Sequence, residues 1–219
     1  MQDKNIYPIA LHLNGAPVLV VGFGQVGRRK VTALLEAGAL VTACDPKIYS
    51  VDMDSVAGLT LHIESYTPDL MTQQHWRLVF VCTNNAKVNA QIQADAAQAG
   101  WLCCRTDAGE EGDFHGMATT YADGITLAVS TSAPALSSRI RDQLADHIDP
   151  TTRAIATAMP AWRAMVLAAP TQSVRIQRVL RTLASSEFEG FVRSYGIFCV
   201  QGLLEQWVSR PEQELEFKP

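Results

Sequence analysis

A glycine pattern near the start of the chain places the strongest constraint on its fold. Gly22, Gly24 and Gly27 form the sequence Gly-x-Gly-x-x-Gly directly after the apolar run 17–21. A short, continuous apolar run that ends in glycine is typical of a buried parallel strand. Residues 25–37 then carry apolar side chains at helical spacing. The strand, turn and helix together predict the first unit of a Rossmann-type domain, whose turn binds the diphosphate of a dinucleotide.

The residues of this turn have separate roles in dinucleotide binding. Gly22 allows a tight turn, Gly24 lets the backbone approach the diphosphate, and Gly27 lets the helix pack closely on the strand. The backbone N–H groups of Gln25 and Val26, at the start of the helix, are expected to bind phosphate oxygens. A glycine-rich turn without a ligand is the alternative that the motif alone leaves open.

An acidic residue strengthens the dinucleotide interpretation. Asp45 closes the next predicted strand, residues 40–44, about 20 residues beyond the turn, where a carboxylate accepts hydrogen bonds from the adenosine ribose. A carboxylate there would repel a 2′-phosphate, so the sequence favours NAD over NADP as the cofactor, although Lys47 close by leaves NADP open. The alternative role of Asp45 is that of a turn residue before Pro46.

Strands and helices continue to alternate toward residue 107. Further strands are predicted at residues 59–63, 78–82 and 101–104, with a helix that ends near residue 99. This alternation indicates a parallel α/β sheet. Thr83 and Asn84 follow one of these strands at the end that faces the ligand crevice, so we expect them to line the nicotinamide side of the site. A capped helix start in the run 83–85 is the equal alternative.

The pattern changes after Asp107. Strand-like segments on either side of residues 122–124 predict a β-hairpin, and Pro134 opens a helix that reaches residue 148. Beyond residue 151 only helices are expected, at 154–168, 173–185 and 188–208, and the tail from residue 210 is expected to be loose. The predicted fold class is α/β, with a Rossmann-type parallel sheet, a small α+β region and an all-α C-terminal domain.

Composition excludes several classes of protein. The chain has 219 residues, of which 18 are Lys or Arg and 22 are Asp or Glu, and this net charge of −4 argues against a general nucleic-acid binder. The five cysteines show no zinc-ligand spacing and mostly stand in apolar runs, which predicts reduced thiols and a cytoplasmic protein. The polar N-terminus indicates no signal peptide, and no apolar run is long enough to cross a membrane.

The chain resembles the precorrin-2 dehydrogenase family, which includes the N-terminal module of siroheme synthase. The similarity extends over residues 7–145 and is carried by motifs that occur in family order. These motifs are Tyr7-Pro-Ile9, the glycine turn continued by Arg28-Arg-Lys30, Leu34-Leu-Glu-Ala-Gly-Ala39, Thr83-Asn-Asn85 with Val88-Asn89, Asp107, Asp113-Phe114, and Leu127-Ala-Val-Ser-Thr131 with Pro134-Ala-Leu136. Over residues 151–219 the resemblance lies only in length and helical character.

The resemblance implies three parts and one reaction. An NAD-binding Rossmann domain would occupy residues 1–113, a dimerisation region residues 114–150, and a helical C-terminal domain residues 151–219, in a homodimer. The implied activity is the NAD-dependent oxidation of precorrin-2 to sirohydrochlorin in siroheme biosynthesis. Some family members also insert Fe²⁺ into sirohydrochlorin, and the sequence leaves that activity open, with iron as a passing substrate. A non-catalytic NAD-binding regulatory module is the alternative, and an unrelated small dehydrogenase is a third reading.

Asp107 is the candidate catalytic residue. It stands just past the predicted strand 101–104, in the expected crevice, and it occupies the position of the family's catalytic aspartate. Loss of hydride from a reduced tetrapyrrole also requires loss of a proton, and a carboxylate beside the nicotinamide is a suitable acceptor. The alternative is a turn residue before the glycine at position 109.

The polycarboxylate substrate implied by the family requires anion-binding groups. Ser130, Thr131 and Ser132 precede a helix start that offers free N–H groups, and an N-cap at Ser132 is the alternative. The family usually has a longer loop here, with two glycines. His115 is a weaker candidate for substrate or iron binding.

Basic residues gather toward the end of the chain. Residues 151–186 contain five arginines and no acidic residue, and residues 151–219 carry a net +2 against −6 for residues 1–150. Because arginine pairs with carboxylates through two parallel hydrogen bonds, we expect at least one of these to bind substrate, with Arg163 as the candidate. A solvated helix face is the alternative.

Overall fold

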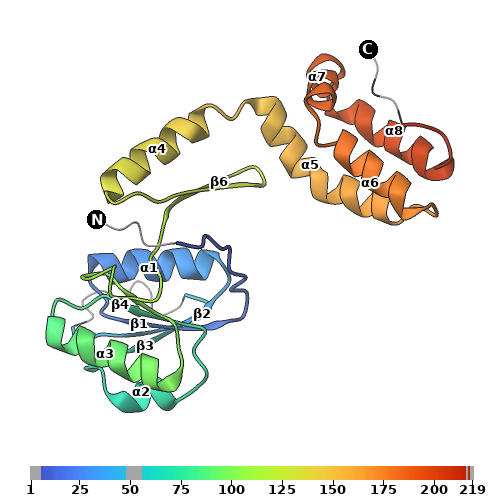
Figure 1. Ribbon diagram of the computed structural model, residues 1–219. Helices are drawn as coiled ribbons and strands as arrows, with labels where there is room; N and C mark the ends of the chain where they lie inside the picture. Colours follow the sequence, from blue (N-terminus) through green and yellow to red (C-terminus); the bar gives the residue numbers. More distant parts are fainter. Residues whose placement is uncertain (1–5, 48–55, 216, 218–219) are drawn as a thin grey trace. The chain divides into compact units, whose positions relative to one another are not determined.

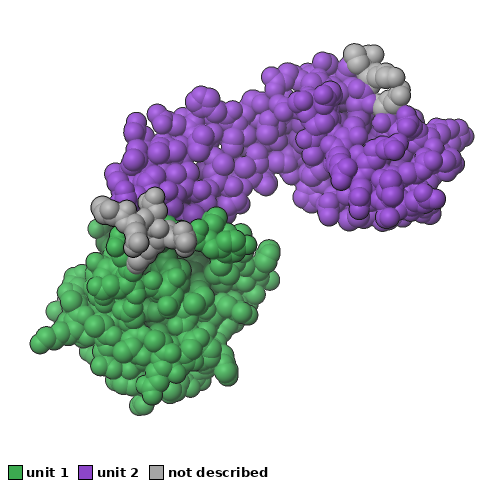
Figure 2. Space-filling view, in the orientation of Figure 1, with its two compact units in different colours: residues 1–116 green, residues 117–219 purple. Residues whose placement is uncertain are grey.

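The computed structural model describes residues 6–47, 56–215 and 217 of the chain. The residues form two compact units, 1–116 and 117–219 (Figure 2). The first ends three residues beyond the predicted Rossmann domain. Division of the second into a dimerisation region and a helical domain stays a prediction. The polar N-terminal residues 1–5 lie outside the described residues.

The first unit contains a parallel sheet. Its strands are β1 (Pro17–Val21), β2 (Leu40–Cys44), β3 (Leu59–His62), β4 (Leu78–Val81) and β5 (Cys103–Arg105). They are arranged in the order β3-β2-β1-β4-β5, and every neighbouring pair is parallel. The chain order reverses between β1 and β4, and in open α/β sheets that reversal creates the ligand-binding crevice at the carboxyl ends of the strands. The predicted parallel α/β sheet is therefore confirmed.

Helices cover both faces of this sheet. They are α1 (Gln25–Glu36), α2 (Pro68–Thr72) and α3 (Ala86–Ala99). The helix α1 lies on one face, and α2 and α3 lie on the other (Figure 1). Side chains alternate along the central strand, so that Val18 and Val20 enter the core beneath α1 while Leu19 and Val21 enter the opposite core. Continuous burial of β1 thus reflects two apolar faces, as its sequence indicates.

The last strand begins two residues later than the sequence predicts. The N–H of Trp101 still donates to the carbonyl of Ala96 as the chain leaves α3, so β5 starts only at Cys103 and extends to Arg105. On the outer edge of β5, Asp113 exchanges two hydrogen bonds with Cys103, at 2.8 and 2.9 Å. This returning segment covers an edge strand that would otherwise expose unpaired backbone groups.

The second unit opens with the predicted hairpin. β6 (Ala118–Ala122) and β7 (Ile125–Val129) are antiparallel, and they are joined through Asp123 and Gly124 with φ of 48° and 81°. Positive φ at both central residues is the signature of a type I′ turn, which matches the twist of the strands. α4 (Pro134–Asp146) packs across both strands of the hairpin.

A helical core follows. It is built from α5 (Pro150–Leu167), α6 (Ser173–Thr182), α7 (Ser186–Tyr195) and α8 (Ile197–Ser209). The prediction of one helix over 188–208 is wrong, because the chain breaks at Gly196, whose φ of 80° lies in the left-handed region that favours glycine. Trp162, Phe188 and Leu204 lie at the centre of this core, and each is at most 2% exposed.

The expectation of a loose tail is wrong for the described residues after 209. Arg175 donates to the carbonyl oxygens of Pro211 and Glu212, at 3.3 and 2.6 Å. The indole N–H of Trp207 donates to the carbonyl of residue 213 at 3.2 Å. The ring of Phe217 lies edge-on to Phe188, with 4.7 Å between the centroids. The tail therefore closes the helical core, an effect that local composition does not reveal.

Two further observations concern the whole described part of the chain. None of its helices has the length and hydrophobicity that a bilayer span requires. All five cysteines are free; four are buried and Cys199 is exposed. Burial raises the pKa of the Cys44 and Cys103 thiols to about 12, so these thiols stay protonated.

Candidate functional site

Two glycines of the turn are required by close packing. Gly22 has φ of 98°, and a Cβ placed there would lie 2.6 Å from the carbonyl carbon of Cys82. A Cβ on Gly27 would lie 1.9 Å from the carbonyl oxygen of Gly22. Both positions exclude any side chain, so β1, β4 and α1 can meet only because these residues are glycines.

Gly24 is different because its surroundings are open. A Cβ at this position meets no described atom within 4 Å, although Gly24 itself is the N-cap of α1. Among the described residues no side chain caps this helix and no acidic residue stands in its first turn. Gly24, Gln25 and Val26 are all exposed. The helix start therefore presents backbone N–H groups to an open space, which fits the diphosphate of a dinucleotide.

Asp45 is attached to the glycine turn. Its Oδ2 accepts the backbone N–H of Phe23 at 2.7 Å, and its Oδ1 accepts the N–H of Lys47 at 2.8 Å. Asp45 thus does what a turn residue does, as the alternative reading anticipated. Each carboxylate oxygen retains a second lone pair, so hydrogen bonds from a ribose remain compatible with this geometry.

Thr83 links the glycine turn to the next helix. Its backbone nitrogen lies 2.8 Å from the Cβ position of Gly22. Its hydroxyl donates a short hydrogen bond to the amide oxygen of Asn89, whose Nδ2 donates back to the carbonyl of Thr83 at 3.0 Å. Asn89 is fully buried. This reciprocal pair fixes the end of β4 against the first turns of α3.

The predicted capped helix start in the run 83–85 is confirmed at Asn85. Asn85 accepts hydrogen bonds from the N–H groups of Lys87 and Val88, at 3.0 and 3.3 Å, as the N-cap of α3. Asn84 is exposed at the same edge of the sheet. A role for Thr83 or Asn84 beside the nicotinamide stays a prediction.

Asp107 lies two residues beyond Arg105, at the carboxyl end of β5. Arg105 donates from Nε to Oδ1 at 3.1 Å and from Nη2 to Oδ2 at 2.7 Å, a bidentate pair. The Arg105 side chain is 7% exposed and that of Asp107 is 30% exposed. Hydrogen bonding from Arg105, opposed by partial burial and aided by the Asn89 amide, lowers the pKa of Asp107 to about 2. The carboxylate is therefore ionised at physiological pH and faces the surface.

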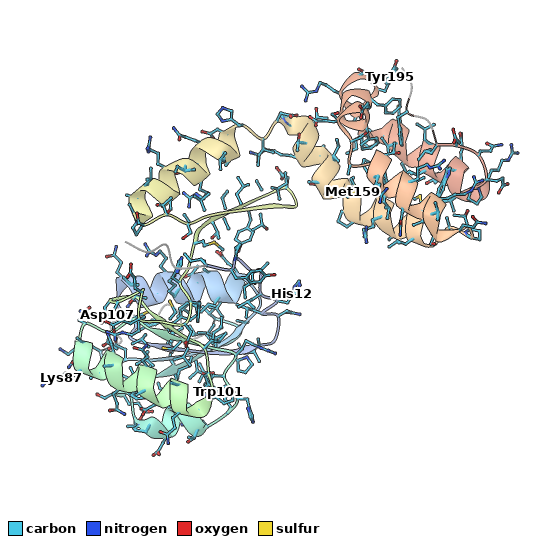
Figure 3. All side chains as sticks on the ribbon, in the orientation of Figure 1. His12, Lys87, Trp101, Asp107, Met159 and Tyr195 are labelled. Atoms are coloured by element: carbon cyan, nitrogen blue, oxygen red, sulfur yellow. The ribbon has the colours of Figure 1, made fainter. Side chains whose placement is uncertain are left out.

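Asn89 connects the candidate catalytic residue to the cofactor turn. The Asn89 amide is hydrogen-bonded to Thr83 and helps to lower the pKa of the Asp107 carboxyl group, and Thr83 in turn lies against Gly22. Figure 3 shows Asp107 at the same end of the first unit as Lys87, which lies in the first turn of α3, and far from Trp101. The carboxyl edge of the sheet thus brings the predicted cofactor residues and the predicted catalytic residue together.

Sequence reasoning missed two residues of this site. Asn89 belongs to the family motif, but the sequence alone does not indicate its contact with Thr83. For Arg105, the available signal in the sequence is a charged residue directly after the apolar run 101–104. Its Nη1 also donates to Gln93 at 3.2 Å and to Glu111 at 2.7 Å. His115 lies in the same unit and is exposed.

The other candidate residues belong to the second unit. The Thr131 hydroxyl accepts the N–H of Ala133 at 3.2 Å, and the N–H of Thr131 donates to the Ser137 hydroxyl at 2.9 Å. The N-cap of α4 is Ala133, so the alternative of an N-cap at Ser132 is wrong. Binding of a substrate carboxylate by Ser130, Thr131 or Ser132 stays a prediction.

The arginines of residues 151–186 divide into two groups. Arg153 donates to the carbonyls of Ala145 and Ile148, at 2.8 and 3.0 Å, and so stabilises the end of α4. Arg175 holds the tail, and Arg178 pairs with a glutamate of the tail at 3.2 Å. Arg163 and Arg181 are exposed, and within the described residues neither has a hydrogen bond or ion pair. Those two remain available to a ligand.

No group of three or more metal-ligating side chains occurs in the part of the chain that the structure describes. The site described above comprises a helix start, an amide and a fixed carboxylate. 

Comparisons with known proteins identify the family to which the first unit belongs. Residues 9–118, about half the chain, match the family model described as putative NAD(P)-binding. The siroheme synthase of Gluconobacter oxydans (strain 621H) is 29% identical over 75% of this chain and 36% of its own length. That of Gluconacetobacter diazotrophicus is 31% identical over 81% of this chain and 39% of its own length. The chain thus spans well under half the length of these relatives.

The fold has a solved counterpart. A structure described as SirC, precorrin-2 dehydrogenase, aligns with a TM-score of 0.75 over 94% of this chain and 100% of that one, at 20% sequence identity. The similarity establishes a shared fold. The chain therefore belongs to the putative NAD(P)-binding family, as a homologue of the siroheme synthases, with NAD(P) as the cofactor of its first unit.

Proposed function

We propose that this protein oxidises precorrin-2 to sirohydrochlorin with NAD as the acceptor. The observation that carries the proposal is the connection of Asp107, through Asn89 and Thr83, to the glycine turn at Gly22. An ionised carboxylate at the same edge of the sheet as a dinucleotide turn suits a reaction that removes hydride and proton together. The siroheme synthase relatives supply the class of substrate.

Different residues of the first unit would bind different parts of the cofactor. The N–H groups at Gly24, Gln25 and Val26 hold the diphosphate, and Asp45 accepts the ribose hydroxyls and selects NAD against NADP. Thr83 and Asn84 line the nicotinamide side. When bound, NAD would supply the acceptor for the hydride that precorrin-2 loses, and one proton would be released for each hydride.

Asp107 would receive that proton. Its low pKa of about 2 makes it a weak base, so it holds a proton only briefly before passing it to water. This suits a substrate that becomes strongly acidic as hydride leaves. The 30% exposure of the side chain leaves a path from the carboxylate to solvent. Asp107 therefore acts as an intermediate carrier rather than as a strong general base.

Substrate binding is assigned to cations and hydroxyls. Arg163, which has no partner within the described residues, would pair with a carboxylate of the tetrapyrrole, as would the hydroxyls of Ser130, Thr131 and Ser132. His115 completes the candidate set. Fe²⁺ would enter as a second substrate, inserted into sirohydrochlorin.

A homodimer is part of the proposal. The segment 117–148 contributes no side chain to any of the three apolar cores formed by the described residues, and Ser137 is its only buried residue there. Tyr121, Leu136 and Leu144 are 74%, 37% and 49% exposed. A hairpin and helix without a core of their own are suited to pairing with a second copy. The four buried, free thiols suit a cytoplasmic protein.

One assay tests the function. The purified chain is mixed with NAD and enzymatically prepared precorrin-2 under anaerobic conditions, and NADH and the sirohydrochlorin spectrum are followed together. We expect the two products to appear in equal amounts, and more slowly with NADP. Binding of NAD without either product would favour the regulatory module instead. Addition of Fe²⁺ to sirohydrochlorin, against a control without protein, tests chelation separately.

A further inference from the structure

Arg105 is a charged residue in an apolar strand. It ends β5, pairs in register with Val81 of β4, and is 6% exposed. A buried guanidinium is costly unless its donors are paired. The sheet therefore retains a charge at a position where its neighbours Cys103 and Cys104 are buried and apolar. The contacts of Arg105 indicate what this charge does.

The first contact is the two-point pair with Asp107. Nε and Nη2 reach the two carboxylate oxygens separately, at 3.1 and 2.7 Å. Two parallel bonds from a planar guanidinium fix the direction of the carboxylate as well as its distance, which a lysine ammonium does not do. The plane of the Asp107 carboxylate is therefore set by a side chain anchored in the sheet.

The remaining nitrogen secures the loop that follows. Nη1 donates to Glu111 at 2.7 Å and to Gln93 of α3 at 3.2 Å. The Gln93 amide in turn donates to the carbonyl of Glu111. The loop from Asp107 to Glu111 is thus closed around one guanidinium and attached to a helix. All three nitrogens of Arg105 have protein partners, so the substrate's carboxylates compete poorly for it.

We propose that Arg105 is a positioning residue for the dehydrogenation, which holds the Asp107 carboxylate in the orientation in which it accepts the substrate proton. The proposal rests on the function proposed above. Arg105 itself is buried, and its three side-chain nitrogens all donate to protein groups. Its charge also keeps Asp107 ionised, in agreement with the lowered pKa of that carboxyl group. Without Arg105, the Asp107 carboxylate would lose the two-point pair that sets its plane and would be protonated at a higher pH.

The test uses three substitutions in the full chain. Arg105→Gln removes the charge and the two-point pair, Arg105→Lys keeps the charge alone, and Glu111→Gln weakens the loop contact but leaves the pair with Asp107. Arg178→Gln, in an exposed arginine–glutamate pair, is the matched control. Thermal unfolding checks that each variant is folded. Two measurements follow: the NMR titration of the Asp107 carboxyl carbon without cofactor, assigned by its loss in Asp107→Asn, and steady-state kinetics against pH.

We expect Arg105→Gln to move the Asp107 titration up by about one pH unit or more and to lower kcat by roughly 10- to 100-fold, the effect of losing hydrogen bonds between charged groups. KM for NAD should not change. Arg105→Lys should keep the low titration and still lose activity, because the charge remains and the orientation does not. Glu111→Gln and Arg178→Gln should keep both the titration and most of the activity.

Several results would overturn the proposal. One is wild-type kcat in Arg105→Lys, which also decides the matter if Arg105→Gln does not fold. Another is an Asp107 titration unchanged in a folded Arg105→Gln, and a third is an equal loss of kcat in Glu111→Gln, which would mean loop support only. An inactive wild-type protein would instead remove the proposed function, while the NMR titration would still report whether Arg105 controls Asp107.

Discussion

The backbone N–H of Phe23 donates a 2.7 Å hydrogen bond to Oδ2 of Asp45. This bond joins the middle of the glycine turn to the end of the neighbouring strand β2. The carboxylate that is expected to select the ribose therefore also shapes the turn that is expected to hold the diphosphate. Loss of the Asp45 carboxylate should therefore weaken cofactor binding both at the ribose and at the diphosphate.

Replacement of Asp45 tests this double role. Asp45→Ala removes the acceptors for the N–H groups of Phe23 and Lys47 together with the ribose site. We expect KM for NAD to rise at least about 10-fold and the preference over NADP to fall, since hydrogen bonds to a charged group are among the stronger ones. Asp69→Asn, in an exposed helix turn, is the control. Unchanged KM values for both cofactors would leave Asp45 as a turn residue only.

Alanine substitution at two glycines of the same turn should have different effects: one should reduce NAD binding and the other should reduce stability. The Cβ of Gly24→Ala meets no described atom within 4 Å, so stability should stay at the wild-type level while NAD binding falls. The Cβ of Gly27→Ala would lie 1.9 Å from the carbonyl oxygen of Gly22, so the free energy of unfolding should fall by ~1–3 kcal/mol or more. Thermal unfolding and calorimetric NAD titration of both variants separate the two effects. Equal destabilisation of both would contradict an open phosphate site.

The sequence was sufficient to predict the sheet because its signals are local. Gly22 and Gly27 follow an apolar run and open a helix, and strands and helices then alternate to residue 107, which is enough to predict a parallel sheet. The order of the strands was not predicted and comes from the structure. The partners of Arg105 were not predictable, because Gln93 and Glu111 come from a helix and a loop that only the fold brings together. Gly196 illustrates a different limit: a single glycine interrupts the helical pattern of 188–208, and only its positive φ shows that it ends a helix.

Asp107 should make stability depend on pH in the acid range. Its pKa falls from 3.8 to about 2 on folding, so the stabilisation is complete above the unfolded value and is lost as the pH falls through the folded value. With solvent screening at a partly exposed site, we expect about 1 kcal/mol. Denaturant unfolding of wild type and Asp107→Asn from pH 5 to pH 2 should give a difference that shrinks below about pH 4. A difference independent of pH would mean that the pair with Arg105 does not persist in solution.

Pairing of two copies through the hairpin and α4 can be tested by introducing one charged side chain into that surface. Leu144 is 49% exposed on α4, in the segment that has no core of its own. Leu144→Glu should convert a dimer to a monomer in light scattering after gel filtration, because a buried, unpaired carboxylate is costly. Leu167→Glu, at a comparably exposed leucine of α5, should keep the dimer. A monomeric wild type would overturn this part of the proposal.

Replacement of Arg163 should raise KM for precorrin-2 but not KM for NAD. It is exposed and has no partner in the described part of the chain, whereas Arg178 pairs with Glu214 at 3.2 Å. Arg163→Gln should raise KM for precorrin-2 by roughly 10-fold, the value of one charge-assisted hydrogen bond, and leave KM for NAD unchanged. Arg178→Gln is the matched loss of one exposed positive charge and should change neither. Because a contact between exposed charges is screened by salt, the difference between the two variants should shrink as ionic strength rises. If Arg163→Gln and Arg178→Gln raise KM for precorrin-2 equally, binding depends on the net charge of the protein and not on a contact with Arg163.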